Sequence, residues 1–209
     1  MRATPFYLRA GNALTVDEPT DPEEEDRFVY DPRDPVTQTV GRNCWALCSE
    51  LEDRRSLDAR PDVVTYTTAP LTEDIELTGP IRTMLYAASS AIDTDFTVAL
   101  SDVFEDGTVN QIQDGIIRAV YRNDAYRPDY LVRGEVYALT IDMAATSYLV
   151  RAGHRLRVSV SSSCFDRYDR NPNTGEPFGR AMTFKVAHQA IHHSKTYPSH
   201  ILLPIIPEG

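Results

Sequence analysis

The sequence has no long apolar run and comparatively few basic residues. No segment approaches the roughly 20 apolar residues that a membrane-spanning helix needs. The first residues, MRATPFYLRAG, lack the apolar core of a signal peptide, so we expect a cytoplasmic protein. Lys and Arg number 21 against 31 Asp and Glu, which gives a net charge of -10. Because phosphate binding needs clustered Lys and Arg, this charge argues against nucleic acid and anionic membrane surfaces as partners.

Cysteine is also scarce, and the odd count of three cannot form a complete disulfide framework. Cys44 and Cys48 have no second pair, since Cys164 stands alone. A structural zinc site built from thiols needs more ligands than that. We therefore expect neither a metal held by these cysteines nor any other cofactor.

The sequence lacks the G-x-S-x-G motif that places a serine nucleophile on a strained turn in α/β-hydrolases. Ser89-Ser90 and Ser161–Ser163 have no flanking glycines. We interpret them as serines of strands or strand ends whose hydroxyls bond the backbone there. The sequence therefore predicts no catalytic residue in this chain.

Histidines gather near the C-terminus, at His188, His192 and His193. On a helix, His188 and His192 would share a face and could ligate a metal. No third ligand is identifiable, so we prefer solvent-exposed polar residues. His154 begins a strand pattern, and we expect it to make a structural hydrogen bond to the facing loop.

Strand signals dominate what is present. In the stretch 153–161, Leu156, Val158 and Val160 alternate with Arg and Ser, which is typical of a half-buried strand. Similar runs recur along the chain with turn residues between them, and no long amphipathic helix is evident. Strands are expected at 6–8 paired with Leu14, 63–67, 75–89 broken into two at Gly79-Pro80, 95–104, 109–121, 136–143, 184–187 and 200–206. Residues 43–58 are left as a short helix or an irregular loop.

This pattern predicts an all-β fold, an antiparallel sandwich, rather than a βαβ fold. No internal repeat or change of composition marks a boundary. We therefore expect a single domain over 1–209, with an irregular opening region at 1–62 and the main sandwich at 63–209.

A polar loop follows the 153–161 strand and carries an oxygen-rich set of side chains. A hard cation such as Ca²⁺ can take such ligands from one loop. However, Gly175 falls one place late for an EF-hand, and Arg180 stands where its last acidic ligand belongs. Turns closed by Asn and Asp side chains explain the composition equally well. The weak calcium candidates are Asp166, Asp169, Asn171 and Asn173.

Several segments resemble one protein family. GHRLRVSVSSSCFDRYDRNPNTG at 153–175 and YPSHILLPIIP at 197–207 are similar to the C-terminal β-domain of the cocaine esterase / X-Pro dipeptidyl-peptidase (CocE/NonD) serine hydrolases. FYLRAGNAL, YDPRDPV, the segment 59–81 and the segments from 94 to 158 follow in the family's order. The pattern departs at Thr37 and Arg42, where the family has proline and glycine.

The resemblance implies a jelly-roll similar to galactose-binding domains, packed against an α/β-hydrolase core and a helical lid. The catalytic motifs belong to that core, so we expect a non-catalytic domain whose partner is an α/β-hydrolase domain or chain. A homo-oligomer is also possible. By position, the loop after YDPRDPV faces the substrate pocket, which makes Trp45 and Leu47 the candidate pocket residues.

Two alternatives stay open at the level of sequence. Trp45 could instead seal one end of the sandwich. The chain could also be a free-standing module that binds carbohydrate or a similar ligand, which would need aromatic side chains on a concave face or at loop tips. The available aromatic residues are Tyr126, Tyr130 and Tyr168.

Overall fold

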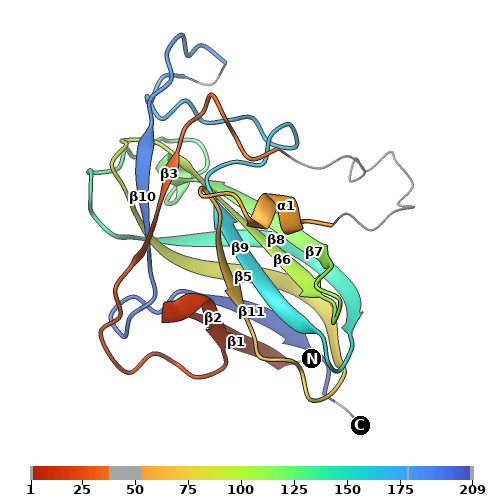
Figure 1. The fold of residues 1–209 in the computed structure, drawn as a ribbon. Coiled ribbons are helices and arrows are strands. Elements are labelled where there is room, and N and C mark those ends of the chain that lie inside the picture. Colours follow the sequence, from red (N-terminus) through yellow and green to blue (C-terminus); the bar gives the residue numbers. More distant parts are fainter. Residues whose placement is uncertain (1, 38–52, 178, 208–209) are drawn as a thin grey trace.

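The computed structural model describes residues 2–37, 53–177 and 179–207. Apart from short turns of helix, its regular elements are strands (Figure 1). The strands are β1 (Arg2–Arg9), β2 (Ala13–Thr15), β3 (Asp26–Tyr30), β4 (Val64–Thr67), β5 (Ile75–Ser89), β6 (Asp95–Val103), β7 (Val109–Arg118), β8 (Tyr137–Val150), β9 (Arg155–Ser161), β10 (Ala187–His192) and β11 (His200–Ile205). The helical turns are η1 (Ala10–Asn12), α1 (Arg55–Asp58) and η2 (Ala119–Tyr121).

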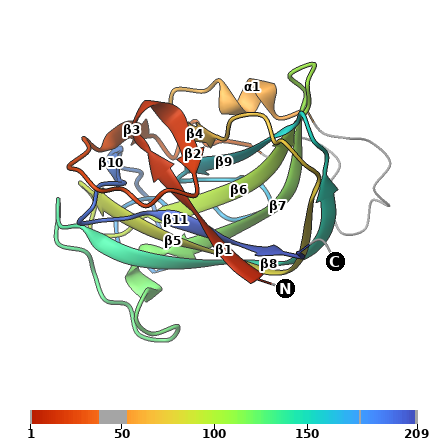
Figure 2. The same ribbon diagram turned by 90° about the horizontal axis from the view of Figure 1, so that it is seen from below.

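The strands form one continuous hydrogen-bonded path, β3-β10-β5-β11-β1-β2-β4-β9-β6-β7, with β8 paired to β5. The path folds over on itself, so that β8, β5, β11 and β1 make one layer and β4, β9, β6 and β7 the other (Figure 2). All pairings between these strands are antiparallel except the single β2–β4 contact. The prediction of an all-β antiparallel fold is confirmed.

The main core lies between the two layers. Successive side chains of a strand point to opposite faces, so every second residue enters the core. Leu77, Ile81 and Leu85 enter from β5, while Val158 and Val160 enter from β9, and all are almost fully buried. The alternation in the sequence therefore marked the inner face correctly.

Strand β6 is buried on both faces, which a simple two-layer sandwich does not require. Phe96, Val98 and Leu100 face the core. On the outer face, the segments around residues 36–37, 54–63 and 163–168 cover the sheet. Val36, Leu57 and Val63 form a small second hydrophobic cluster within this cover.

Close approach of the two layers depends on Gly115 in β7. A Cβ atom there would lie 2.6 Å from the carbonyl oxygen of Asp142 on β8. Any larger residue would push these strands apart, because main-chain atoms cannot move aside cheaply.

Four details of the strand prediction were wrong. Residues 75–89 form one strand, because a shift of register between Pro80 and Arg82 absorbs the irregularity instead of breaking the ladder. Strand β8 continues beyond 143 to Val150 as the partner of that long strand. Strand β7 ends at Arg118, before a 3-10 turn. The strand expected at 184–187 instead begins at Ala187.

The long loop after β9 is anchored by two buried asparagines. The Asn171 side chain donates to Asp95 Oδ1 at 2.8 Å and accepts from the Asn173 backbone N–H at 2.9 Å. The Asn173 side chain donates to the Lys185 carbonyl at 2.7 Å. Asp95 is itself held by Arg118 through hydrogen bonds of 2.9 and 3.1 Å. The loop is therefore fastened to a buried ion pair.

Asp93 sits beside this ion pair and is only 6% exposed. Its Oδ1 atom has no hydrogen-bond partner in the structure. Burial, and next the negative charge of Asp95, raise the pKa of Asp93 to about 6. The Asp93 carboxyl therefore binds a proton more tightly in the folded protein than in the unfolded chain. Ionisation of Asp93 at higher pH consequently lowers the stability of the fold.

We predict that Asp93→Asn stabilises the protein at pH 8 by up to about 3 kcal/mol, since two pKa units correspond to that free energy. Above about pH 6, Asp93 is ionised in the folded protein, and the full loss of stability caused by its charge applies. At about pH 4 the carboxyl is protonated in the folded protein and partly so in the unfolded chain, so the gain from Asp93→Asn should almost disappear. Urea unfolding at the two pH values measures both. Asp142→Asn, an exposed acid on β8, is the control, and a variant destabilised at pH 8 would contradict the assignment.

A second buried ionisable group joins β10 to the opening segment. His193 is fully buried, and its ring nitrogens lie 3.1 Å from Glu23 and 3.0 Å from Asp26. Tyr66 donates a further hydrogen bond of 2.8 Å to Asp26. Burial alone would lower the pKa of His193, but the bonds and charges of Asp26 and Glu23 outweigh it and raise the pKa.

We predict that His193→Gln destabilises the protein more at pH 5.5 than at pH 8.5. The stability that His193 contributes is complete below its ordinary pKa near 6.5 and declines as the pH rises through the raised value. We expect a loss of about 1–3 kcal/mol at pH 5.5 in urea unfolding. His188→Gln, at an exposed position on β10, should have little effect. An equal loss at both pH values would mean that packing alone is responsible.

Candidate functional site

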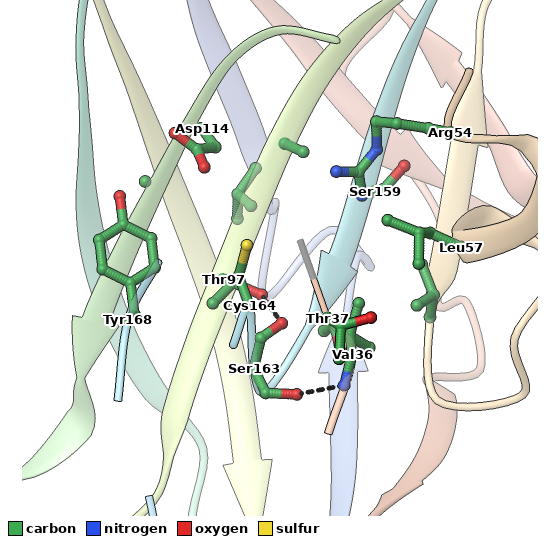
Figure 3. Close-up of a pocket in the computed structure, with 15 residues that line it drawn as sticks. Val36, Thr37, Arg54, Leu57, Thr97, Asp114, Ser159, Ser163, Cys164 and Tyr168 are labelled. Atoms are coloured by element: carbon green, nitrogen blue, oxygen red, sulfur yellow. Dashed lines mark hydrogen bonds between the residues drawn. The ribbon is translucent and has the colours of Figure 1, made fainter. Parts of the chain in front are cut away.

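A pocket lies on the outer face of β9, β6 and β7, between the covering segments (Figure 3). Its enclosed space is small, about 20 Å³, which is room for about one water molecule. Thr37 and Asp53 are the described residues on either side of the segment 38–52, and each forms an isolated β-bridge. Thr37 pairs with Phe165, and Asp53 pairs with Asn110.

The floor of the pocket exists because the outer face of the sheet carries small side chains. Thr97 and Ala99 come from β6, and Ser159 and Ser161 come from β9. Large residues at these positions would fill the space. Val36, Leu57 and Val63 add an apolar wall on one side.

Hydrogen bonds hold the covering segments against the sheet. Ser159 donates to Asp58 Oδ1 at 2.9 Å, and Ser161 donates to the Asp62 carbonyl at the same distance. Ser163 Oγ accepts the Val36 N–H at 2.9 Å (Figure 3). Thr97 donates to the Ser163 carbonyl at 3.3 Å. These bonds position the apolar wall and the pocket floor together.

Two charged residues face the pocket from opposite sides, Arg54 and Asp114 (Figure 3). Each is only 8% exposed. Arg54 donates from Nη1 to Gln111 Oε1 at 2.5 Å, and its Nε lies 3.6 Å from Asp58 Oδ1. Asp114 Oδ1 pairs with Arg167 at 3.0 Å. Arg54 Nε and Asp114 Oδ2 have no hydrogen-bond partner.

The pocket holds no activated nucleophile among the described residues. Burial raises the pKa of the Cys164 thiol to about 11, and the charge of Asp114 adds to the effect, so the thiol is neutral at pH 7. Ser161 and Ser163 are bonded to backbone groups. Ser89 and Ser90 likewise accept backbone N–H groups, from Ala91 and His188. The expectation that these serines bond the backbone is confirmed for four of the five, whereas Ser162 Oγ accepts a hydrogen bond of 2.9 Å from the Gln189 side chain.

The predicted pocket residues Trp45 and Leu47 lie outside the described residues. Of the calcium candidates, Asp166 and Asp169 are exposed, whereas Asn171 and Asn173 are buried and bonded within the loop. In the ranges that the structure describes, no group of three or more His, Cys, Asp or Glu is placed to hold a metal. A calcium site in this loop stays a prediction.

The histidines have different surroundings from those expected. His188, His192 and His193 lie at a strand rather than on a helix, and His193 is fully buried, so the solvent-exposed interpretation was wrong for it. A sequence cannot show that distant acids converge on one histidine. His154 makes its side-chain hydrogen bond, 2.9 Å long, to Asp102 in strand β6 rather than to a loop.

The three tyrosines of the alternative function occupy separate surroundings. Tyr168 lines the pocket. Tyr130 donates to the Gly175 carbonyl at 3.1 Å, and Tyr126 is 92% exposed. No observation of the described chain arranges them as a platform for a sugar.

The sequence analysis did not single out Arg54 or Asp114. Arg54 lies in a run of charged residues, which normally indicates a solvated surface. Asp114 precedes Gly115 in a strand that also carries Gln111 and Gln113. Small or apolar residues on both faces of a strand, as at 97–100 in β6, are the signal that both faces are covered.

Comparison with known proteins gives consistent results. A family model described as the X-Pro dipeptidyl-peptidase C-terminal non-catalytic domain matches residues 1–202. Cocaine esterase from Rhodococcus sp. (strain MB1 Bresler) is 40% identical over 214 residues, which cover 97% of this chain and 37% of the esterase. The chain thus spans only about a third of the length of this relative.

Solved structures agree with this assignment. An aminopeptidase from a marine sediment Thaumarchaeota archaeon superimposes with a TM-score of 0.89 at 28% identity, over 99% of this chain and 37% of that one. An α-amino acid ester hydrolase gives a TM-score of 0.88 at 32% identity, over 98% and 36%. No helix in the described part of the chain is long and apolar enough to cross a membrane. From the family match and the 40% identical relative together, the chain belongs to the X-Pro dipeptidyl-peptidase C-terminal non-catalytic domain family.

Proposed function

We propose that this chain is the β-domain of a serine hydrolase of the cocaine esterase type. In this proposal it packs beside an α/β-hydrolase catalytic part that cleaves an ester or an X-Pro peptide, and it works in the cytoplasm. It stabilises the assembly and forms one wall of the substrate pocket. Support comes from the match along almost the whole chain to about a third of the cocaine esterase.

The observation that carries the pocket role is the anchoring of both flanks of the segment 38–52. Thr37 is paired to Phe165 and Asp53 to Asn110. Backbone pairing on both sides gives a segment a fixed base, as is usual for binding loops on a rigid scaffold. Trp45 and Leu47, which belong to this segment, are the proposed pocket residues.

We predict that the purified chain alone hydrolyses neither a short-chain p-nitrophenyl ester nor an X-Pro anilide. An active-site fluorophosphonate should leave it unlabelled, because the Cys164 thiol is neutral and the serines bond the backbone. Turnover abolished by the probe would overturn the non-catalytic assignment, and Ser161–Ser163 would be mutated first.

We predict that Trp45→Ala weakens substrate binding in an intact enzyme. The chain would replace the matching part of the Rhodococcus cocaine esterase, and kinetics would be measured with a p-nitrophenyl ester. Loss of a large aromatic contact should raise KM about tenfold with a smaller change in kcat. Tyr126→Ala, a fully exposed aromatic, is the matched control. An unchanged KM with a lower melting temperature would favour the alternative in which Trp45 seals the sandwich.

A further inference from the structure

A second pocket lies between the end of β7 and the long loop that joins β9 to β10. Asp93 and Arg118 line it beside the sheet, and Asp169, Arg170 and Glu176 line it from the loop. It has room of about 190 Å³. A cavity of about 150 Å³ accepts a molecule of the size of benzene. This pocket is therefore large enough for a small organic group rather than for a single water.

The pocket contains a buried acid with an unsatisfied oxygen. Asp93 is only 6% exposed, and its Oδ1 atom has no hydrogen-bond partner in the structure. A buried charged acceptor without a partner loses its hydration and gains nothing in exchange. The negative charge of Asp95 nearby makes ionisation of Asp93 still less favourable. A positively charged hydrogen-bond donor in the pocket would relieve both effects.

The two basic residues of the lining have other contacts. Arg118 donates to both carboxylate oxygens of Asp95, at 2.9 and 3.1 Å. The Arg170 guanidinium lies 4.7 Å from the centre of the Phe184 ring and donates to the Pro32 carbonyl at 3.2 Å. Neither guanidinium donates a hydrogen bond to Asp93 Oδ1.

The pocket carries more negative than positive charge. Once Arg118 is paired with Asp95, the lining holds three acids and one base. The two outer acids, Asp169 and Glu176, are exposed, so water and salt screen their charges. Asp93 lies deeper, where its charge acts more strongly. The complementary ligand is therefore a cation whose charged group reaches Asp93.

The chemistry of the lining favours an organic cation over a metal ion. In the described ranges, no three His, Cys, Asp or Glu side chains are placed to hold a metal. Pro172, Ala181 and Phe184 add an apolar wall, which suits an alkyl chain. Ammonium and guanidinium groups combine positive charge with N–H donors, which is what a buried carboxylate requires.

We propose that this pocket binds an alkylammonium or alkylguanidinium group, whose N–H donors pair with the Asp93 carboxylate. The group belongs either to a free amine or to a Lys or Arg side chain of the catalytic part. The charge of Asp93 lowers the stability of the fold, so folding does not require it. A carboxylate of that kind in a pocket is typical of a binding group.

The test titrates butylammonium into the 209-residue chain at pH 7.5 and follows backbone amide and Asp carboxyl signals by NMR. We expect millimolar affinity, with the largest shifts at Asp93, Thr94 and Ala181. Butan-1-ol lacks the charge and tetramethylammonium lacks the N–H donors, so both should bind at least tenfold more weakly. Equal binding of butan-1-ol, or no shift at these positions, would overturn the proposal.

The affinity should fall about tenfold from pH 7.5 to pH 5, because the pKa of Asp93 is about 6 and its protonated form has no charge. Bound butylammonium should in turn lower the pKa of Asp93. The other charged groups that face this site are Asp95 from β6, Arg118 from β7, and Asp169, Arg170 and Glu176 from the loop.

Asp93→Asn separates the role of Asp93 from that of the neighbouring charges. It should weaken butylammonium binding at least tenfold at pH 7.5 and abolish the pH dependence. Asp142→Asn, which removes an exposed acid on β8, should bind as the unchanged chain does. Unchanged affinity in folded Asp93→Asn would contradict the site. If that variant does not fold, an Asp93 pKa that butylammonium leaves unchanged is the contradicting result.

The chimera with the esterase distinguishes the two sources of the cation. If the natural ligand is a free amine, butylammonium still binds to the chimera. If the catalytic part supplies a Lys or Arg side chain, butylammonium no longer binds, and Asp93→Asn destabilises the chimera although it stabilises the chain alone. Both results retain the site. An inactive chimera with normal binding to the chain alone would disprove the proposed function but not this inference.

Discussion

Burial of strand β6 on both faces is the constraint on which the rest of the structure depends. Its inner residues, such as Val98 and Leu100, meet the opposite layer in the main core. Its outer residues, Thr97 and Ala99, are equally buried, although they face away from that core. A covered outer face must be formed from small side chains, and the covering segments must bond whatever polar groups it presents. The candidate pocket is the space that remains between these segments.

Most buried polar groups in this cover have hydrogen-bond partners, and a few atoms have none. Asp58 accepts hydrogen bonds from Ser159 and Arg157, and it ties α1 to the sheet. Asp95 is similarly surrounded by Arg118 and Asn171. Such networks make a rigid scaffold, because each member would be costly to expose without its partner. The few atoms without partners then indicate either a ligand or a cost that the fold tolerates.

The fold was largely predictable because its causes are local. Alternation placed the inner face of β9, and Asp106-Gly107 marked the turn between β6 and β7. The prediction failed where distant residues decide the outcome. The sequence around His193 does not indicate that Glu23 and Asp26 of the opening segment contact its ring. Arg54 looked like a surface charge because the sequence does not show that α1 packs on a sheet. Of the residues that line the pocket, Ser161 and Ser163 were named in the sequence analysis only as serines that bond the backbone, and the role of Trp45 stays a prediction.

The motif on which the family resemblance was strongest explains fold rather than substrate. Within 153–175, Ser161 and Ser163 fasten the covering segments, and Asn171 and Asn173 fasten the loop. In this chain, these residues therefore have structural roles. In the proposed assembly, contacts to substrate would instead come from side chains of the segment between the two anchored flanks, Thr37 and Asp53.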